Sequence, residues 1–242
     1  MTIERIHQEI KFRWNKLNSN HKKDFPVAYI DDAINKASED YVEIFYSGNN
    51  SKQYKFGFEV TQQRTDLLQT IVVPADVAYT PIQVFPDQFS FDLSALNEKY
   101  RHFLRAYIVP VECPSKKIPV AITRSNDLDT KLADANTQPS LLWNRCLGSI
   151  QGNTLRLYTK DYTVLGLYIE YLTDPVKVFS GGYDSLEFLN GDTLAYQSGS
   201  PKVTSNLPNH DILVDMTVQY IASTLEDVNK FQLQEKQILT KV

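Results

Sequence analysis

The chain has 242 residues, of which 42% are hydrophobic and 22% are charged, and its formal net charge at neutral pH is −4. This composition excludes wholesale disorder, and the length allows one large domain or two small ones, each with a real core. The acidic balance argues against a protein that grips nucleic acid over its whole surface, although it allows a local basic patch.

The cysteines and the N-terminal residues predict a cellular compartment. Cys113 and Cys146 lie far apart in the sequence and share no CxxC spacing, so we expect neither a disulfide framework nor a zinc site. The opening "MTIERIHQEIKFRW" is charged from Glu4 onward and lacks the apolar stretch of a signal peptide. No apolar run approaches the roughly 18 residues of a membrane span. We therefore expect a soluble intracellular protein without membrane contact.

The first fifty residues predict two helices. Apolar residues recur at spacings of three and four in the first helix: Ile3, Ile6, Ile10, Trp14 and Leu17. After the polar turn "NSNHKKD", Pro26 opens a second helix, which Gly48 ends. Its apolar face carries Ile30, Ala33, Ile34, Ala37, Tyr41 and Phe45.

The region from about Tyr54 to Ser205 predicts strands, because prolines punctuate alternating runs such as "QFSFDL" and "RAYIVPVEC". In "IQGNTLRLYTKDYTVLGLYIEYLTDP" two β-runs are predicted to pair as a hairpin, with Lys160 and Asp161 near the connection. Between "RAYIVPVEC" and this hairpin, "SNDLDTKLADANTQPS" predicts one short helix near residues 126–134, capped by Ser125 or Asn126.

The stretch "PNHDILVDMTVQYIASTLEDVNKFQLQEKQ" predicts a C-terminal helix. Its apolar residues spread over roughly two thirds of the circumference, wider than the ~100° stripe of a surface helix. Asp215, Gln219 and Glu226 leave only a thin polar seam. We therefore expect an α+β fold in three parts: a helical segment at 1–60, a β-rich domain at 61–205, and a helix at 206–242. The last helix packs with the first two and forms a helical frame that carries the β-rich domain.

Motifs for nucleotide binding and acyl transfer are missing from the sequence. It contains neither GxxxxGK[ST] nor GxGxxG, and the nearest string to a nucleophile elbow, "GSIQG", has its serine in the wrong place. The adjacent Asp31 and Asp32 diverge by about 100° on a helix and so cannot converge as a catalytic pair. Active sites assemble from distant residues, so a hydrolase stays open if carboxylates converge in a pocket. We nevertheless expect no enzyme and no catalytic residues.

Metal ligation is also not predicted. The four histidines fall in different segments and are best explained as surface or helix-end residues: His7, His21, His102 and His210. The acidic run Asp127, Asp129 and Asp134 hints at calcium. However, Lys131 and Leu132 stand where a calcium loop needs an oxygen ligand and a glycine. We expect capping and solvated helix surface instead, and no metal or cofactor.

The basic and aromatic string "KFRWNKL" is the one feature that resembles a nucleic-acid site, since aromatic rings could stack on bases beside Lys11, Arg13 and Lys16. Trp14, however, shares the apolar stripe of its helix. We therefore favour a core position for Trp14 and a solvated face for the basic residues.

Several local patterns occur in a recognisable order. The helix "SNDLDTKLADANTQPS" is followed by the strands "GNTLRLYTKDYTVLGLYIEYLTDPVKV", by "DSLEF", and by "HDILVDMTVQYIASTLEDVNKFQL". In this order the chain resembles the neck, or head–tail connector, ring proteins of crAss-like and related Bacteroidetes tailed phages. The opening "FRWNKLNSNHKKDFPVAYIDDAINKASEDYVE" is similar to the helical entry of such proteins. The link "LNGDTLAYQSGSPKVTSNLP" is longer than in that pattern, and the block from Gln62 to Cys113 carries no resemblance.

The resemblance implies a non-enzymatic virion protein, assembled in the host cytoplasm and located in the neck of the phage. Many copies, with twelve-fold symmetry, would form a ring between the portal vertex and the tail. Its partners would be the portal protein and other neck or tail ring proteins. Genomic DNA would pass through the channel without sequence-specific binding.

A ring needs contacts between two different faces of each subunit. For packing between subunits or within the core we expect the C-terminal helix residues Leu213, Met216, Tyr220, Leu225 and Phe231. Lys160 and Asp161 are the expected contact with a neighbouring ring. The alternative is a phage adhesin or binding module whose β-rich domain, with many tyrosines, recognises a glycan or peptide.

Overall fold

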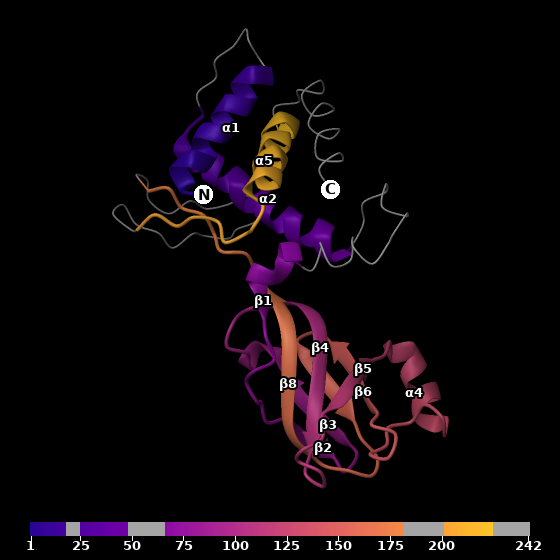
Figure 1. Ribbon diagram of the computed structural model, residues 1–242. Coiled ribbons are helices and arrows are strands. Elements are labelled where there is room, and N and C mark those ends of the chain that lie inside the picture. The colour runs from indigo at the N-terminus through magenta and orange to yellow at the C-terminus, as the bar shows by residue number, and fades with distance from the viewer. Residues whose placement is uncertain (18–24, 48–65, 182–200, 225–242) are drawn as a thin grey trace. The chain divides into compact units, whose positions relative to one another are not determined.

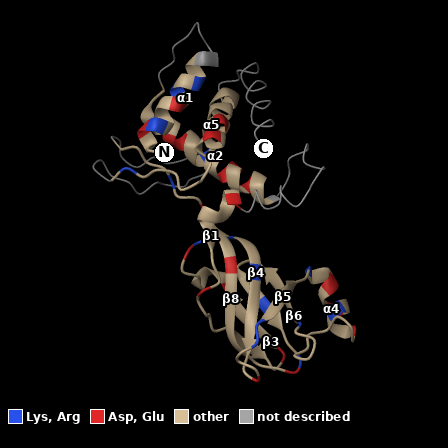
Figure 2. Ribbon diagram, viewed as in Figure 1, with Lys and Arg blue, Asp and Glu red and all other residues tan. Residues whose placement is uncertain are grey.

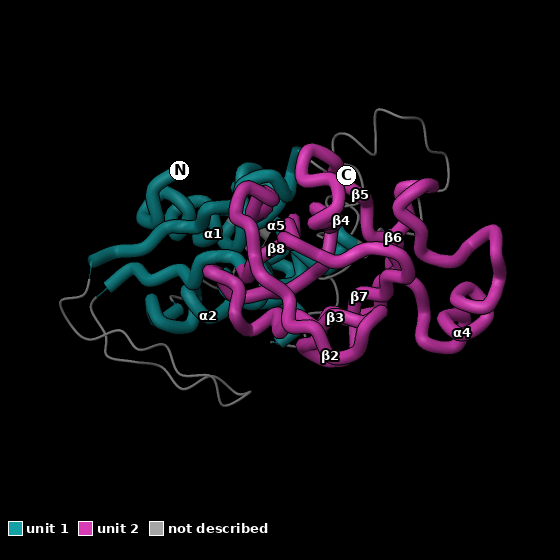
Figure 3. Tube along the Cα trace, turned by 90° about the horizontal axis from the view of Figure 1, so that it is seen from below, with its two compact units in different colours: residues 1–71, 175–242 teal, residues 72–174 magenta. Residues whose placement is uncertain are grey.

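The computed structural model describes residues 1–17, 25–47, 66–181 and 201–224 (Figure 1). These residues form two compact units, coloured separately in Figure 3. Among these described residues, unit 1 comprises 1–17, 25–47, 66–71, 175–181 and 201–224, and unit 2 comprises 72–174. Residues 175–181 and 201–205, which fall in the β-rich segment expected from the sequence, therefore belong to the helical unit.

Unit 1 is built from α1 (Ile3–Leu17), α2 (Val27–Ser47) and α5 (His210–Thr224), and the short helix η1 (Gln69–Ile71) ends its first segment. The predicted apolar stripes lie inside: Ile3, Ile6, Ile10 and Trp14 of α1 are buried, as are Ile30, Ile34, Tyr41 and Phe45 of α2. α5 contacts both of these helices. Seven consecutive residues of α5, from Ile212 to Val218, are buried, so the helix is covered on nearly every side, as its wide apolar arc predicts.

An extended segment of unit 1 is bound along one face of α2. Asp31 Oδ2 accepts hydrogen bonds from Ser180 N at 2.8 Å and from Ser180 Oγ at 2.7 Å. One turn later, Asn35 bonds to the backbone of Val178. Residues four apart on a helix rise about 6 Å, close to the advance of two residues in a strand, so the helix can meet every second residue of the segment. The intervening Phe179 pairs with Val203 through two backbone hydrogen bonds.

Unit 2 is an eight-stranded sheet in the order β1-β8-β4-β5-β6-β7-β3-β2. Its strands are β1 (Val72–Val73), β2 (Ile82–Phe85), β3 (Gln88–Asp92), β4 (Tyr100–Pro110), β5 (Ile118–Ile122), β6 (Cys146–Gln151), β7 (Thr154–Tyr158) and β8 (Val164–Thr173). The pairing of β5 with β6 is parallel and the other strand pairs are antiparallel. The crossover from β5 to β6 carries α4 (Ser125–Ala133), and the short helix η2 (Leu93–Ala95) follows β3.

The sheet of unit 2 is curled, so that residues from distant strands meet in one core (Figure 1). Phe89 and Leu157 on one side of β5 share a buried cluster with Ile108 and Ile169 on the other. A flat sheet could not bring these side chains together, because β3 and β8 stand five places apart in the strand order. The chain is therefore α+β, with helices at both ends of the described sequence and a central β-rich unit, as the sequence predicts.

The predicted hairpin around Lys160 and Asp161 is wrong. β7 pairs with β6 and β3, whereas β8 pairs with β4 and β1, so the two runs are not neighbours in the sheet. The tight turn lies one strand earlier, between β6 and β7, where Gly152 adopts a φ of 58°. Alternating runs identify strands but not their partners, and the Gly152-Asn153 turn signal pairs β7 with the strand before it.

Two other expectations are corrected. The short helix begins at Ser125, close to the prediction, but its N-cap is Arg124, with no side-chain cap, instead of Ser125 or Asn126. Thr123 N still donates to Gly148 O, so β-type pairing persists to within one residue of the cap. His7, expected at a surface or helix end, is buried in unit 1, where its Nε2 lies 2.7 Å from Asp31 Oδ1.

Candidate functional site

A four-residue turn in unit 2 presents two large apolar side chains to solvent. Ser140 and Arg145 close the turn with two backbone hydrogen bonds of 3.0 Å each. Asn144 takes a φ of 50°, a left-handed conformation that asparagine tolerates better than most residues. At the tip, Leu142 is 77% exposed and Trp143 is 73% exposed. We call residues 140–145 the apolar turn.

The base of the apolar turn is fixed from several sides. Leu141 N donates to Asp161 Oδ1 at 2.9 Å, and Lys116 Nζ donates to Leu141 O at 3.3 Å. The hydroxyl of Tyr162 donates to Arg145 O at 2.9 Å. Because both ends of the turn are held by neighbouring elements, the turn has little conformational freedom to lose when it binds a partner.

Tyr162, whose hydroxyl holds one end of the apolar turn, is deeply buried. Tyr162 packs in the core of unit 2, and burial raises the pKa of its hydroxyl, so that the group remains a hydrogen-bond donor at neutral pH. Cys146, the first residue of β6, is fully buried beside it, and burial raises the pKa of its thiol to about 12. Both groups are therefore neutral parts of the structure and not nucleophiles.

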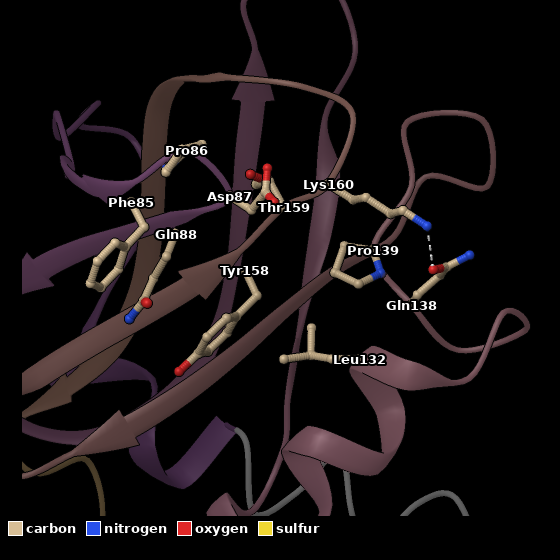
Figure 4. Close-up of a pocket in the computed structure, with 10 residues that line it drawn as sticks. All are labelled: Phe85, Pro86, Asp87, Gln88, Leu132, Gln138, Pro139, Tyr158, Thr159 and Lys160. Carbon is tan, nitrogen blue, oxygen red and sulfur yellow. Dashed lines mark hydrogen bonds between the residues drawn. The ribbon is translucent and has the colours of Figure 1, made fainter.

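A pocket of about 420 Å³ lies beside the turn, in the same unit (Figure 4). It is lined by the β2–β3 connection, the end of β7, helix α4 and the segment that leads into the apolar turn: Phe85, Pro86, Asp87, Gln88, Leu132, Gln138, Pro139, Tyr158, Thr159 and Lys160. Lys160 Nζ donates to Gln138 Oε1 at 2.6 Å and so joins two of these walls. The volume lies within the ~300–1,000 Å³ of pockets that enclose an organic group.

The edge strand β2 adds a second exposed apolar surface. All four of its residues are exposed, and Ile82, at 72%, is as open to solvent as the tip of the turn. β2 is the last strand in the order, so one side of its backbone has no strand beside it in unit 2. Exposed apolar edges of this kind are typical of interaction surfaces.

The residues predicted as interface fall into three groups. Leu213 and Met216 are buried within unit 1, and Tyr220 is partly buried with Lys36 Nζ 5.9 Å from its ring centroid. Leu225 and Phe231 lie outside the described residues. Lys160 and Asp161 are exposed: Lys160 lines the pocket, and Asp161 holds the base of the apolar turn through its bond to Leu141.

The basic string in α1 serves the fold of unit 1. Arg13 forms ion pairs with Asp215, which is buried, and with Asp211 at 2.7 Å, and Trp14 is buried. α1 carries acidic as well as basic residues (Figure 2). This arrangement agrees with a core position for Trp14, but the solvated face expected for the basic residues is wrong for Arg13, which is mostly buried against α5.

The cluster of His7, Asp31 and Ser180 does not have the geometry of an acyl-transfer triad. Ser180 Oγ donates to Asp31 and not to the imidazole, so the carboxylate stands between the two groups that a triad joins directly.

In the part of the chain that the structure describes, no three His, Cys, Asp or Glu side chains gather as a metal site. Among the same residues, no helix has the length and apolarity needed to cross a membrane.

No protein-family model matches this chain, and a comparison with curated proteins finds no match.

Sequence reasoning did not find Leu142 and Trp143. The signal was an apolar run, "LLW", placed directly after Pro139 and Ser140 and only three residues before a strand. Such a run is too short to separate a buried segment from an exposed one without knowledge of the turn.

Proposed function

We propose that the chain is a non-enzymatic structural subunit of a tailed-phage virion, and that it forms a ring in the neck between portal and tail. The observation that carries this proposal is the apolar turn, which holds Leu142 and Trp143 in solvent on a fixed base. The resemblance to neck ring proteins supports the same function. The partners would be the portal protein and neighbouring tail rings, with genomic DNA passing through without sequence-specific contacts.

The chemistry of the turn suits a protein–protein contact. Tryptophan is enriched among the residues that dominate binding energy, and a large aromatic side chain buries roughly 150–250 Å² when it is enclosed. Leu142 and Trp143 are adjacent and both exposed, and contiguous exposed apolar surface is typical of interaction sites. The subunit also offers the pocket beside the turn and the edge strand β2 as further contact surfaces, and a closed ring needs contacts between two different surfaces of each subunit.

A second function, a phage adhesin or binding module, is favoured by the pocket. Tyr158 and Phe85 supply aromatic surface there, and Asp87, Gln88 and Gln138 supply hydrogen-bonding groups, a combination that suits a glycan or a peptide. In this function the chain would act as a monomer or small oligomer, and its ligand would occupy the pocket.

Native mass spectrometry and negative-stain electron microscopy of the full chain, alone and mixed with the portal protein of the same phage, test the first function. A closed ring, formed alone or on the portal, is the expected result. A chain that stays monomeric at about 50 µM, alone and with portal protein, would contradict the ring. Saturable binding of a glycan by that monomer would favour the adhesin instead.

A further inference from the structure

We propose that the pocket of unit 2 is the receptor for Trp143 of a second copy of this chain. The inference deepens the proposed ring function, because it assigns the two surfaces that join one subunit to the next. The occupant is the apolar turn of a neighbouring subunit, with the indole ring of Trp143 inside the pocket and Leu142 at its rim.

The turn cannot readily fill the pocket of its own chain. Trp143 is 73% exposed and does not line the pocket, although Gln138 and Pro139, just before the turn, do. The backbone pairing of Ser140 with Arg145 and the hydrogen bond from Leu141 to Asp161 hold the tip in this position. Reaching its own pocket would require breaking these contacts, whereas a neighbour's turn can enter without rearrangement.

The lining of the pocket matches the three requirements of an indole ring. Phe85, Pro86, Leu132 and Pro139 supply apolar walls. A buried indole N–H needs an acceptor, and the exposed carboxylate of Asp87 stands at the pocket.

The third requirement is a cation near the ring face. Lys160 carries its ammonium group at the pocket wall, where Gln138 orients it (Figure 4). A cation over tryptophan adds attraction beyond the buried area. Lys160 is one of the two residues expected from sequence to contact a neighbour, and this geometry gives it a partner within the ring instead of in an adjacent ring.

Each copy carries one turn and one pocket, so one subunit can engage two different neighbours. Contacts of this head-to-tail kind close into rings when the rotation per subunit allows it. If two copies instead exchange their turns reciprocally, association ends at a dimer.

Two variants separate the turn from the pocket. Trp143→Ser removes the insert, and Leu132→Glu places a charge on the pocket wall, where desolvation opposes docking. Matched controls are Val111→Ser, an exposed apolar residue of unit 2 away from the pocket, and Ala133→Glu, the exposed neighbour of Leu132 on α4. We expect each of the first pair to weaken self-association at least about tenfold and each control to leave it unchanged.

Mixing the two variants gives the decisive readout. The Trp143→Ser chain retains its pocket and the Leu132→Glu chain retains its turn, so an equimolar mixture should form a 1:1 heterodimer that grows no further. Circular dichroism and cooperative unfolding establish that each variant is folded. Wild-type association by either variant, or a mixture of folded variants that remains monomeric, would overturn the proposal.

Photo-crosslinking identifies the receptor directly. Trp143 is replaced by p-benzoylphenylalanine, and the labelled chain is mixed with ¹⁵N-labelled wild-type chain before irradiation. Cross-links between copies should map to residues 85–88, 132, 138–139 or 158–160. Cross-links confined to other segments would overturn the docking.

The outcomes for ring and docking are distinguishable. A ring that persists in Trp143→Ser supports the neck function and rejects the docking. A wild-type dimer with the expected cross-links supports the docking and rejects the ring. A wild-type chain that stays monomeric both alone and with portal protein, without cross-links between copies, rejects both, and so does such a monomer whose pocket binds glycan.

Discussion

Asn35 and Val178 exchange two hydrogen bonds inside unit 1: Val178 N donates to Asn35 Oδ1 at 2.6 Å, and Asn35 Nδ2 donates to Val178 O at 3.2 Å. The side-chain amide of Asn35, on α2, thus makes the two hydrogen bonds that a neighbouring strand would otherwise make to Val178. Both residues are buried, so water cannot replace either bond. The contact fixes the segment that returns from the β-rich unit onto α2.

Asn35→Ala is expected to lower the free energy of unfolding of unit 1 by about 2–4 kcal/mol, because it leaves the N–H and C=O of Val178 buried without partners. Asn35→Asp should also destabilise, since it loses the donor to Val178 O and places a carboxyl group at a buried site. Urea unfolding monitored by Trp14 fluorescence, in a Trp143→Phe background that leaves one tryptophan, measures the change. The exposed Asn97→Ala serves as control, and equal stabilities for Asn35→Ala and this control would contradict the role of the contact.

The two aspartates that pair with Arg13 should contribute unequally. Asp215 is fully buried and Asp211 is 64% exposed, while Arg13 is mostly buried. Asp215→Ala leaves the guanidinium without its buried partner and should cost about 2–4 kcal/mol, whereas Asp211→Ala should cost less than about 1 kcal/mol. Chemical denaturation of the two variants provides the comparison, with Asp211→Ala as the matched control. Similar losses for both would mean that burial does not govern this ion pair.

Periodic patterns predicted the helices better than they predicted the sheet. The stripe from Ile3 to Trp14 and the wide apolar arc of α5 specify burial locally, because helical neighbours are close in sequence. The partner of β7 could not be read from the alternation of Leu155 and Leu157, because register and pairing depend on residues far apart in the chain.

The polar contacts of unit 1 and the candidate site could not be predicted from the sequence, because they too join residues far apart in the chain. Asp31 looked like a helix-start residue, but its partners His7 and Ser180 lie 24 and 149 positions away. Lys160 and Asp161 were identified as contact residues from an incorrect hairpin. The bond from Leu141 to Asp161 and the place of Lys160 at the pocket join segments about 20 residues apart, which no local pattern encodes.

The free energy of unfolding should fall as the pH rises above about 8.5. Burial raises the pKa of both Tyr162 and Cys146, so the folded chain retains protons that the unfolded chain releases near pH 8.5–10. The unfolded state then binds fewer protons than the folded state, and the slope of stability with pH is negative.

Urea midpoints between about pH 8 and pH 10.5 measure this slope. Tyr162→Phe removes one of the titrating groups and should make the slope shallower. It should also lower the free energy of unfolding by a constant amount at every pH, because the hydrogen bond to Arg145 is lost. Tyr46→Phe, at a more exposed site, is the control for the loss of a tyrosine hydroxyl. An unchanged slope in Tyr162→Phe would show that this hydroxyl is not protected by the fold.

Asp161 should act on association through the apolar turn and not through a contact of its own. Its carboxylate accepts the hydrogen bond from Leu141 N, so Asp161→Ala frees the base of the turn. Because Asp161 is exposed, the free energy of unfolding should change by less than about 1 kcal/mol. Hydrogen exchange at the Leu141 amide should accelerate, and self-association measured by sedimentation should weaken, because the turn must then be ordered on binding.

Asp161→Asn retains an acceptor oxygen and should restore both properties, and Asp129→Ala, on the exposed face of α4, is the charge-matched control. Wild-type association by a variant whose Leu141 amide exchanges freely would show that a fixed turn is not needed for docking.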